Sequence, residues 1–227
     1  MAPKVRKLAV FLTLVLFFFC SGCGIVGLLG TPSRHERKIP AEYDLTEHKD
    51  QKILVLVNQP AYLNAEINLR YYLTEEVREN LIKRIKVSPE ELVGYGELSE
   101  FRSNRGDFSL LSPVEVGSAL GADIVLLVMV ENYQLNEMAE TGYHTGFLGA
   151  ETILLETTAG EKLWPKSAKS KSIRVGFEVE ERGQEVAVER LTSACARCIV
   201  RYLYDCPKNE FKLFDDKSNV GWESWGE

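Results

Sequence analysis

A short apolar segment near the amino terminus limits what the rest of the chain can become. Residues 8–19 carry no charge and are almost entirely apolar, and Lys4, Arg6 and Lys7 precede them. About a dozen residues are too few to cross roughly 30 Å of hydrocarbon as a helix, but they match the apolar core of an export signal. The sequence therefore predicts that residues 1–22 are a signal peptide.

The residues after this segment indicate lipid attachment at Cys23. The small side chains of Cys20-Ser21-Gly22 leave the backbone before Cys23 open to a peptidase. The pattern resembles the lipobox, usually Leu-Ala/Ser-Gly/Ala-Cys, although Cys20 stands where leucine is commonest. The resemblance implies that the Cys23 thiol carries a diacylglycerol and that acyl chains such as palmitate hold the protein at a membrane. The alternatives are an ordinary secretory signal cut elsewhere and an uncleaved anchor.

Removal of the signal makes the chain strongly acidic. The signal takes three cations and no acids with it, so the formal net charge changes from −6 to −9. A surface this acidic is a poor general ligand for nucleic acid or anionic lipid. Gly24 follows Cys23 in place of the aspartate that favours inner-membrane retention in some bacteria, so we expect the outer membrane, facing the periplasm.

The mature chain divides into a tether, one domain and a tail. Residues 23–50 hold glycine, proline and a charged cluster without helical or strand periodicity, which predicts a lipidated tether. Residues 51–207 are long enough for one globular domain with a substantial core. Residues 208–227 form a polar tail with Trp222 and Trp225, which either pack back on the domain or anchor a partner.

Hydrophobic patterning predicts both strands and helices in the domain. Strands are expected at residues 53–57, 122–135, 147–156 and 167–180, with a short one near residue 92. Helices are expected at residues 64–86, 113–120 and 184–204, with Asn64 and Ser112 as N-caps. Residues 97–104 are expected to be a short polar segment. This order predicts an α/β or α+β fold in which helices pack on a mixed sheet.

The first long helix raises a question about its aromatic residues. Its expected buried face carries Ile67, Tyr71, Val77, Leu81 and Ile85. Tyr71 and its neighbours Tyr72 and Tyr62 could line a groove, but one face of a long helix more often supplies core residues.

Two short motifs connect this order of elements to a known structural group. One motif is Pro113-x-x-Val116-Gly117-x-x-Leu120-Gly121-Ala122-Asp123 before a strand, and the other is the turn Thr158-x-Gly160-x-x-Leu163-Trp164. With the lipobox, residues 52–205 resemble the periplasmic lipoproteins of the TolB amino-terminal-domain-like fold, the group of CsgG and LpoB. The resemblance implies a scaffold or adaptor role in the cell envelope and supplies no catalytic residues.

The pair Cys195-Ala-Arg-Cys198 is the strongest candidate for chemistry. A C-x-x-C pattern is typical of redox and metal sites, and residues three apart on a helix share a face. However, the pair lies deep within the predicted helix rather than at its start, where the helix dipole would lower a thiol pKa. Structural cysteines are the favoured interpretation, with a disulfide from Cys206 to Cys195 or Cys198 as an alternative.

No other residues form a pattern that favours catalysis, a cofactor or a metal. His35, His48 and His144 are far apart in the sequence. Several pairs of acidic residues occupy consecutive positions, where the two side chains do not face each other across a cleft. We therefore expect a non-enzymatic, membrane-anchored lipoprotein that docks another envelope protein, without a small-molecule substrate or nucleic acid. A thiol-redox or metal-binding protein using Cys195 and Cys198 is the alternative. A subunit of a pore would need long paired hairpins, for which the pattern gives no sign.

Overall fold

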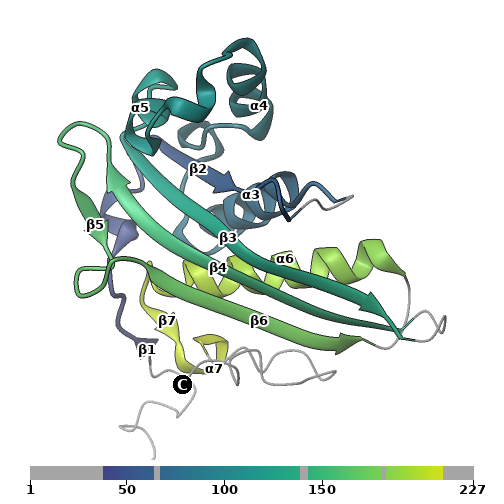
Figure 1. Ribbon diagram of the computed structural model, residues 1–227. Helices are drawn as coiled ribbons and strands as arrows, with labels where there is room; N and C mark the ends of the chain where they lie inside the picture. The colour runs from purple at the N-terminus through teal and green to yellow at the C-terminus, as the bar shows by residue number, and fades with distance from the viewer. Residues whose placement is uncertain (1–37, 64–66, 139–142, 180–182, 212–227) are drawn as a thin grey trace, which may run out of the picture. The chain divides into compact units, whose positions relative to one another are not determined.

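A five-stranded mixed sheet organises the structure (Figure 1). The computed structural model describes residues 38–63, 67–138, 143–179 and 183–211. The sheet strands are β2 (Ile53–Asn58), β3 (Ile124–Glu137), β4 (His144–Glu156), β5 (Lys162–Trp164) and β6 (Lys171–Val179). The α-helices are α3 (Leu69–Asn80), α4 (Tyr95–Asn104), α5 (Pro113–Ala119), α6 (Gln184–Val200) and α7 (Lys208–Phe211). A separate two-stranded sheet joins β1 (Lys38–Ile39) to β7 (Cys206–Pro207).

The pairing of the strands confirms the mixed sheet expected from the sequence. β2 pairs in parallel with the first part of β3, whereas β4 pairs antiparallel with β3 over its whole length. β5 and β6 both pair antiparallel with β4, at different positions along it. A β-bulge interrupts the register of β3 between Val130 and Asn132, just beyond the point where the pairing with β2 ends.

The Gly-Ala-Asp step before β3 fixes the register between β2 and β3. The Asp123 carboxylate accepts a hydrogen bond from the backbone N–H of Lys52 at 2.8 Å, and the Asp123 N–H donates to the Lys52 carbonyl at 2.7 Å. Gly121 has a φ of 67°, in the left-handed region that glycine adopts without strain. The expected end of the helix at Gly121 is therefore confirmed.

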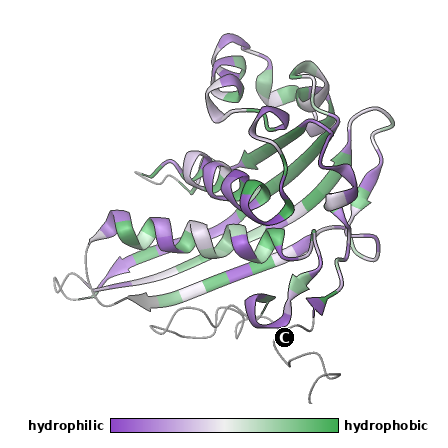
Figure 2. Ribbon diagram, turned by 180° about the vertical axis from the view of Figure 1, so that it is seen from behind, coloured by the Kyte–Doolittle hydropathy of each residue, from purple (hydrophilic) through white to green (hydrophobic). Residues whose placement is uncertain are grey.

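Helices cover the two faces of the sheet unequally. α3 and α6 lie side by side along one face, with hydrophilic residues on their outer sides (Figure 2). Among the strand residues on this face are Val55, Leu126, Leu148, Leu154 and Val175, all buried. α4 and α5 cover only the part of the other face formed by β2 and the start of β3, where Leu54, Leu56, Val125 and Leu127 are buried. The strands in this part are therefore buried on both faces, as their continuous aliphatic runs predicted.

The expected capping of α5 is confirmed. The Ser112 hydroxyl accepts a hydrogen bond from the Glu115 N–H, and the Glu115 carboxylate accepts one from the Ser112 N–H. This capping box satisfies donors that the helix itself cannot pair, and Pro113 occupies the first helical position.

The N-cap and the buried face of the first long helix differ from the prediction. Asn68 caps α3 by accepting from the Tyr71 N–H, whereas the predicted cap, Asn64, lies outside the described residues. The helix continues as a single π-helical segment over Leu81–Ile85. A series spaced by four residues points into the core, namely Leu69, Leu73, Val77, Leu81 and Ile85. The prediction that Tyr71 belongs to the buried face is wrong, because this series excludes it and its side chain is 46% exposed.

Several element boundaries also differ from the prediction. Residues 97–104, expected to be a polar connection, belong to α4, which buries Leu98 as its apolar contact with the sheet. β4 begins at His144 and β6 at Lys171, and α6 ends at Val200 rather than near residue 204. Near residue 92 there is one isolated bridge, between Leu92 and Ile53.

The domain begins before the predicted boundary at residue 51. In addition to β1, a 3₁₀ helix at Leu45–His48 packs on the domain, and Leu45 is fully buried. The Leu45 N–H donates to the Leu203 carbonyl at 3.0 Å, and the Glu42 N–H donates to the Tyr202 carbonyl at 2.9 Å. Residues 38–50, which lack any obvious period, are therefore part of the domain through contacts with distant residues rather than part of the tether.

Replacing Gly117 with alanine is expected to destabilise the domain. A Cβ at this position in α5 would lie 2.4 Å from Val125 Cγ2 and 2.7 Å from Thr157 Cγ2. Val125 is held within β3, and Thr157 is held by hydrogen bonds to the Ala122 and Asp123 carbonyls, so we expect Gly117→Ala to lower the free energy of unfolding by about 1–3 kcal/mol. Urea unfolding of the chain from residue 24 measures this. Gly96→Ala is the control, since a Cβ in α4 there has nothing within 4 Å. Equal stability of the two variants would contradict the packing argument.

Candidate docking site

The first turns of α3 and α6 enclose an open pocket. Because the two helices lie side by side and run in the same direction, both begin at one end of the sheet (Figures 1 and 2). The pocket between them has a volume of about 510 Å³. Its lining residues are Ile67, Asn68, Tyr71, Tyr72, Gln184, Glu185 and Val188. A pocket with apolar walls and a few polar groups is the usual form of a binding site.

Asn68 holds the aromatic wall of the pocket in place. Its side-chain oxygen accepts from the Tyr71 N–H at 3.3 Å, and its side-chain amide donates to the Tyr95 hydroxyl at 2.9 Å. The Tyr71 ring meets the rings of Tyr72 and Tyr95 edge to face, at centroid distances of 5.5 Å and 5.2 Å. This geometry is the favourable one for aromatic pairs, so the ring of Tyr71 is fixed although it is exposed.

Other exposed apolar side chains lie on neighbouring elements. Val186 is in the first turn of α6, Tyr62 precedes α3, Met138 follows the end of β3, and Tyr143 precedes β4. Figure 1 shows that the ends of β3 and β6 and the start of α6 lie together at one end of the sheet. Tyr62 is 76% exposed, and its hydroxyl contacts the Glu131 carbonyl at 3.5 Å. We call Tyr62, Tyr71, Met138, Tyr143, Val186 and the pocket the aromatic end.

Acidic side chains lie next to the pocket. Glu185 lines it, and Glu189 follows one turn later on α6. Glu76 lies on the neighbouring helix, where burial raises the pKa of its carboxyl, and Glu79 and Glu189 add to the effect. A hydrogen bond with Ser193 of α6 acts in the opposite direction and lowers this pKa. The seam between the two helices therefore has a negative potential beside the tyrosines.

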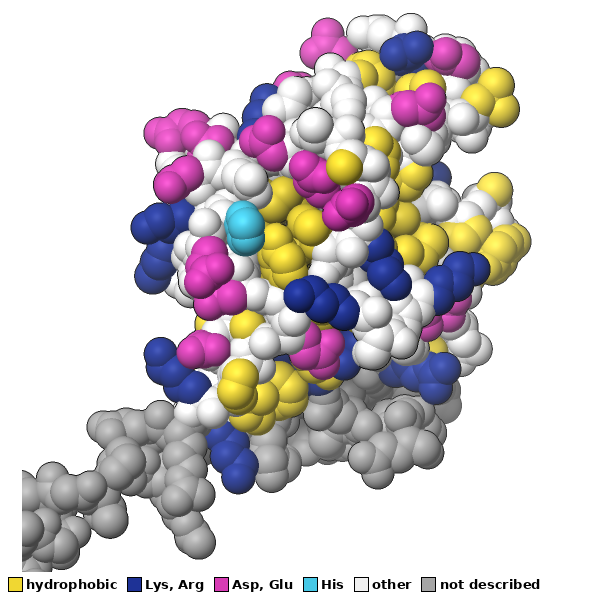
Figure 3. Space-filling model, turned by 90° about the vertical axis from the view of Figure 1, so that its left-hand side faces the viewer, with side chains coloured by type: hydrophobic (Ala, Val, Ile, Leu, Met, Phe, Trp, Pro, Cys, Tyr) yellow, Lys and Arg dark blue, Asp and Glu magenta, His cyan; other side chains and the backbone are white. Residues whose placement is uncertain are grey.

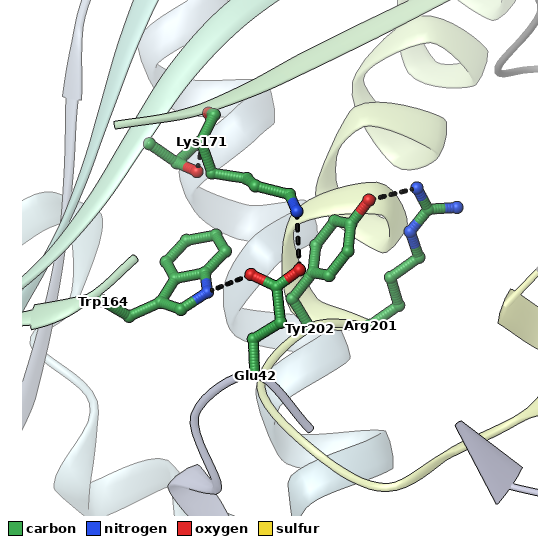
Figure 4. Close-up of polar contacts among 6 residues, drawn as sticks. Glu42, Trp164, Lys171, Arg201 and Tyr202 are labelled. Atoms are coloured by element: carbon green, nitrogen blue, oxygen red, sulfur yellow. Dashed lines mark hydrogen bonds and ion pairs between the residues drawn. The ribbon is translucent and has the colours of Figure 1, made fainter. Parts of the chain in front are cut away.

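A polar cluster holds the opposite end of the domain together (Figure 4). The buried Trp164 indole N–H donates to Glu42 Oε2 at 2.8 Å, and the Lys171 ammonium donates to Glu42 Oε1 at 2.6 Å. Lys171 also lies over the ring of Tyr202, 4.0 Å from its centroid. Glu42 thereby connects the entering chain to the sheet and to the end of α6. We call this cluster the Glu42 latch.

The entry of the chain and the aromatic end lie far apart. Lys38 pairs with Pro207 beyond the end of α6, whereas the pocket lies at the start of α6. Because α6 has 17 residues, the two ends are about 25 Å apart along the helix at about 1.5 Å per residue. The domain thus presents its exposed apolar side chains away from the point where the chain enters it.

The cysteine pair is part of the core of α6. Cys195, Cys198 and Cys206 are all buried free thiols. Burial raises the pKa of the Cys198 thiol to about 11, with Arg201 and Arg197 opposing the shift, and burial also raises the pKa of Cys195. Burial likewise raises the pKa of Cys206. Thiols held in the neutral form are poor nucleophiles and poor metal ligands.

The remaining candidate residues from the sequence lie outside the described part of the chain. These residues are Cys23, Trp222 and Trp225. Among residues 38–63, 67–138, 143–179 and 183–211, no three His, Cys, Asp or Glu side chains come together as a metal site. Within the same residues, no helix is long and apolar enough to cross a membrane.

Charges of both signs are mixed on one face of the domain. Figure 3 shows acidic and basic side chains interspersed around a central apolar area on the face that it views. Such a face gives no continuous basic track of the kind that follows a nucleic-acid backbone. The sequence signal for the aromatic end was the group of tyrosines at residues 62, 71 and 72, for which a groove was one of the two interpretations of the sequence.

Comparisons with known proteins give partial structural likenesses. No family model and no curated protein sequence matches the chain. Lipoprotein GNA1162 from Neisseria meningitidis is 18% identical with a TM-score of 0.41, covering 65% of this chain and 96% of that one. The LpoB C-terminal domain from Salmonella enterica is 18% identical with a TM-score of 0.35, covering 60% and 84%. The PelC dodecamer from Paraburkholderia phytofirmans is 10% identical with a TM-score of 0.40, covering 74% and 97%.

These likenesses are to bacterial lipoproteins among others, and LpoB belongs to the group that the sequence resembles. The identities and TM-scores are too low for any function to be taken from them.

The Glu42 latch yields a prediction about stability. Glu42→Ala leaves the buried Trp164 N–H without its acceptor, which is expected to lower the free energy of unfolding by about 1–3 kcal/mol. Glu42→Gln keeps an acceptor oxygen and loses only a partly exposed ion pair with Lys171, so its loss should be under about 1 kcal/mol. Urea unfolding and trypsin cleavage after Lys49 measure the two effects. Equal losses in both variants would show that the Trp164 hydrogen bond is unimportant.

The buried thiols yield a prediction about reactivity. In the chain from residue 24 at pH 7, a maleimide should label Cys195 and Cys198 at least about a hundredfold more slowly than an exposed cysteine, because a raised pKa leaves almost no thiolate. In urea without reductant, all three cysteines should react. Rapid labelling of the folded protein would favour a redox site, and only one reactive cysteine in urea would reveal a disulfide.

Proposed function

We propose that this chain is an envelope lipoprotein, anchored through Cys23, that docks another envelope protein at its aromatic end. The amino-terminal signal and the lipobox-like residues support the anchoring. The pocket between α3 and α6 supports the docking, since two exposed or partly exposed tyrosines line it and the exposed Val186 lies beside it on α6. Gly24 after the lipidated cysteine supports the outer membrane, with the domain facing the periplasm.

The observation that carries the proposal is the position of the exposed apolar side chains. Tyr71, Val186, Met138 and Tyr143 lie at the end remote from Lys38, where the chain leaves the domain toward its anchor. Single exposed apolar residues are common on any protein, but a group around a pocket is typical of an interaction site. Tyrosine is also a frequent hot-spot residue, because it buries a large area with few rotatable bonds.

The thiol-redox or metal-binding alternative has weaker support. A reactive pair needs thiolates near neutral pH, and burial raises the pKa of both Cys195 and Cys198. Their role in the described domain is to fill space between α6 and the sheet. The non-enzymatic adaptor is therefore the function that we favour.

A pair of substitutions tests the docking surface. Tyr71→Ala with Val186→Ser should reduce capture of the partner at least about tenfold after in-cell crosslinking and pull-down, because each hot-spot truncation weakens binding by about 1–2 kcal/mol. Both side chains are exposed, so the fold should be retained, which circular dichroism verifies.

Two controls make the result interpretable. Leu110→Ser removes an equally apolar side chain, 83% exposed and located after α4, and should leave capture unchanged. Cys23→Ala removes the lipid attachment point and should release the protein from the membrane with loss of capture. Full capture by the Tyr71 and Val186 variant would refute docking at this end.

A further inference from the structure

We propose that the pocket receives a lysine or arginine side chain of the partner protein, its aliphatic stem against Tyr71, Tyr72 and Ile67 and its cationic head beside Glu185 and Glu189. This inference rests on the proposed function and specifies the chemistry of the partner. It commits to a cationic protein segment, as opposed to a lipid or a second copy of this chain.

The walls of the pocket fit the stem of such a side chain. The partly exposed Ile67 provides aliphatic surface, and Tyr71 and Tyr72 provide two rings at 71° to each other. Long cationic side chains bury their methylene groups against surfaces of this kind while the charged head remains at the rim. The exposed face of a tyrosine ring also attracts a cation directly.

The rim supplies the opposite charge. Glu185 and Glu189 are four residues apart, so they lie on one face of α6, one turn from each other. In the described part of the chain, neither forms an ion pair, and both are exposed. Glu76 approaches from α3 and repels Glu189 across the seam. A cation placed here would relieve that repulsion.

Three cations of α3 and the segment after it contact groups outside the pocket. Arg70 donates to the Gln59 carbonyl at 2.9 Å, and Arg78 donates to both oxygens of Glu75. Lys83 pairs with Glu79 and also lowers the pKa of Glu76. Glu185 and Glu189 are left without an ion pair among the described residues, so the charge at the rim favours a cationic partner and opposes an anionic lipid headgroup.

Site-specific photo-crosslinking in cells tests the inference on the full, anchored chain. A benzophenone amino acid replaces Val186, which is exposed beside the pocket but does not line it. We expect an adduct with another envelope protein, mapped to a peptide that contains lysine or arginine. Glu185→Lys with Glu189→Lys should reduce this adduct at least about tenfold, and Glu185→Gln with Glu189→Gln should reduce it less, because charge reversal adds repulsion to the lost attraction.

Matched controls separate charge at the pocket from overall charge. Glu97→Lys with Glu100→Lys makes the same change in net charge on α4, which covers the other face of the sheet, and should leave the adduct unchanged. Circular dichroism establishes that the charge-reversed chains fold.

Other results of the crosslinking experiment would contradict either the cationic partner or the docking itself. An adduct that is unaffected by charge reversal at Glu185 and Glu189 overturns the cationic partner and leaves docking at the aromatic end intact. An adduct with phospholipid or with a second copy of this chain also overturns it. Absence of any adduct from Val186, Tyr62 or Tyr143 overturns the proposed function itself.

Discussion

The pairing of β3 with β4 is the interaction on which the rest of the structure depends. The two strands are hydrogen-bonded from Ile124 opposite Glu156 to Glu137 opposite His144. This ladder extends well beyond β2, which pairs only with residues 124–129 of β3. The projecting part gives β6 a strand to pair with over nine positions, and β6 in turn leads the chain to the start of α6. Without the long ladder, α6 would have no surface on which to lie beside α3.

The direction of the two helices follows from this arrangement and creates the pocket. α3 returns from β2, and α6 returns from β6, and both strands run toward the same end of the sheet. Gly146 of β4 allows α6 to approach closely, since a Cβ there would lie 2.8 Å from Leu191 Cδ1. The first turns of the two helices line the pocket, and the tyrosines there lie outside the buried core. The pocket therefore results from the parallel arrangement of the two helices, and exposed aromatic groups line it.

The parts of the fold that the sequence predicts are those governed by local periodicity. The aliphatic runs at residues 53–57 and 122–130 and the Ser112-Pro113 helix start are confirmed because burial and capping act over a few neighbouring residues. The exposure of Tyr71 was missed because two overlapping series fit the helix, one through Tyr71 and one through Leu69 and Leu73. Which series faces the sheet depends on how α3 sits on β2 and α6, and no local pattern contains that information.

The amino-terminal segment shows the same limit in a different form. Residues 38–48 have no period to detect, and they join the domain through hydrogen bonds to the Tyr202 and Leu203 carbonyls and through the Glu42 latch. Their partners lie more than 120 positions away in the sequence. Contacts of this kind form only in the complete fold. Composition alone therefore predicted that this segment belongs to the tether. The candidate site had one usable signal, the three tyrosines, whereas the acids of α6 join it only once the helices are side by side.

In the proposed function, the lipid anchor and the docking surface belong to different ends of the domain. A lipid tether pulls on the residue where it enters, so that residue must be held by groups that a pull cannot easily displace. Here β1, Leu45 and the Glu42 latch provide that hold around the end of α6. The docking surface lies about 25 Å away along a regular helix, on side chains held by Asn68 and by ring contacts. A preformed surface loses little conformational entropy on binding, which favours the proposed docking.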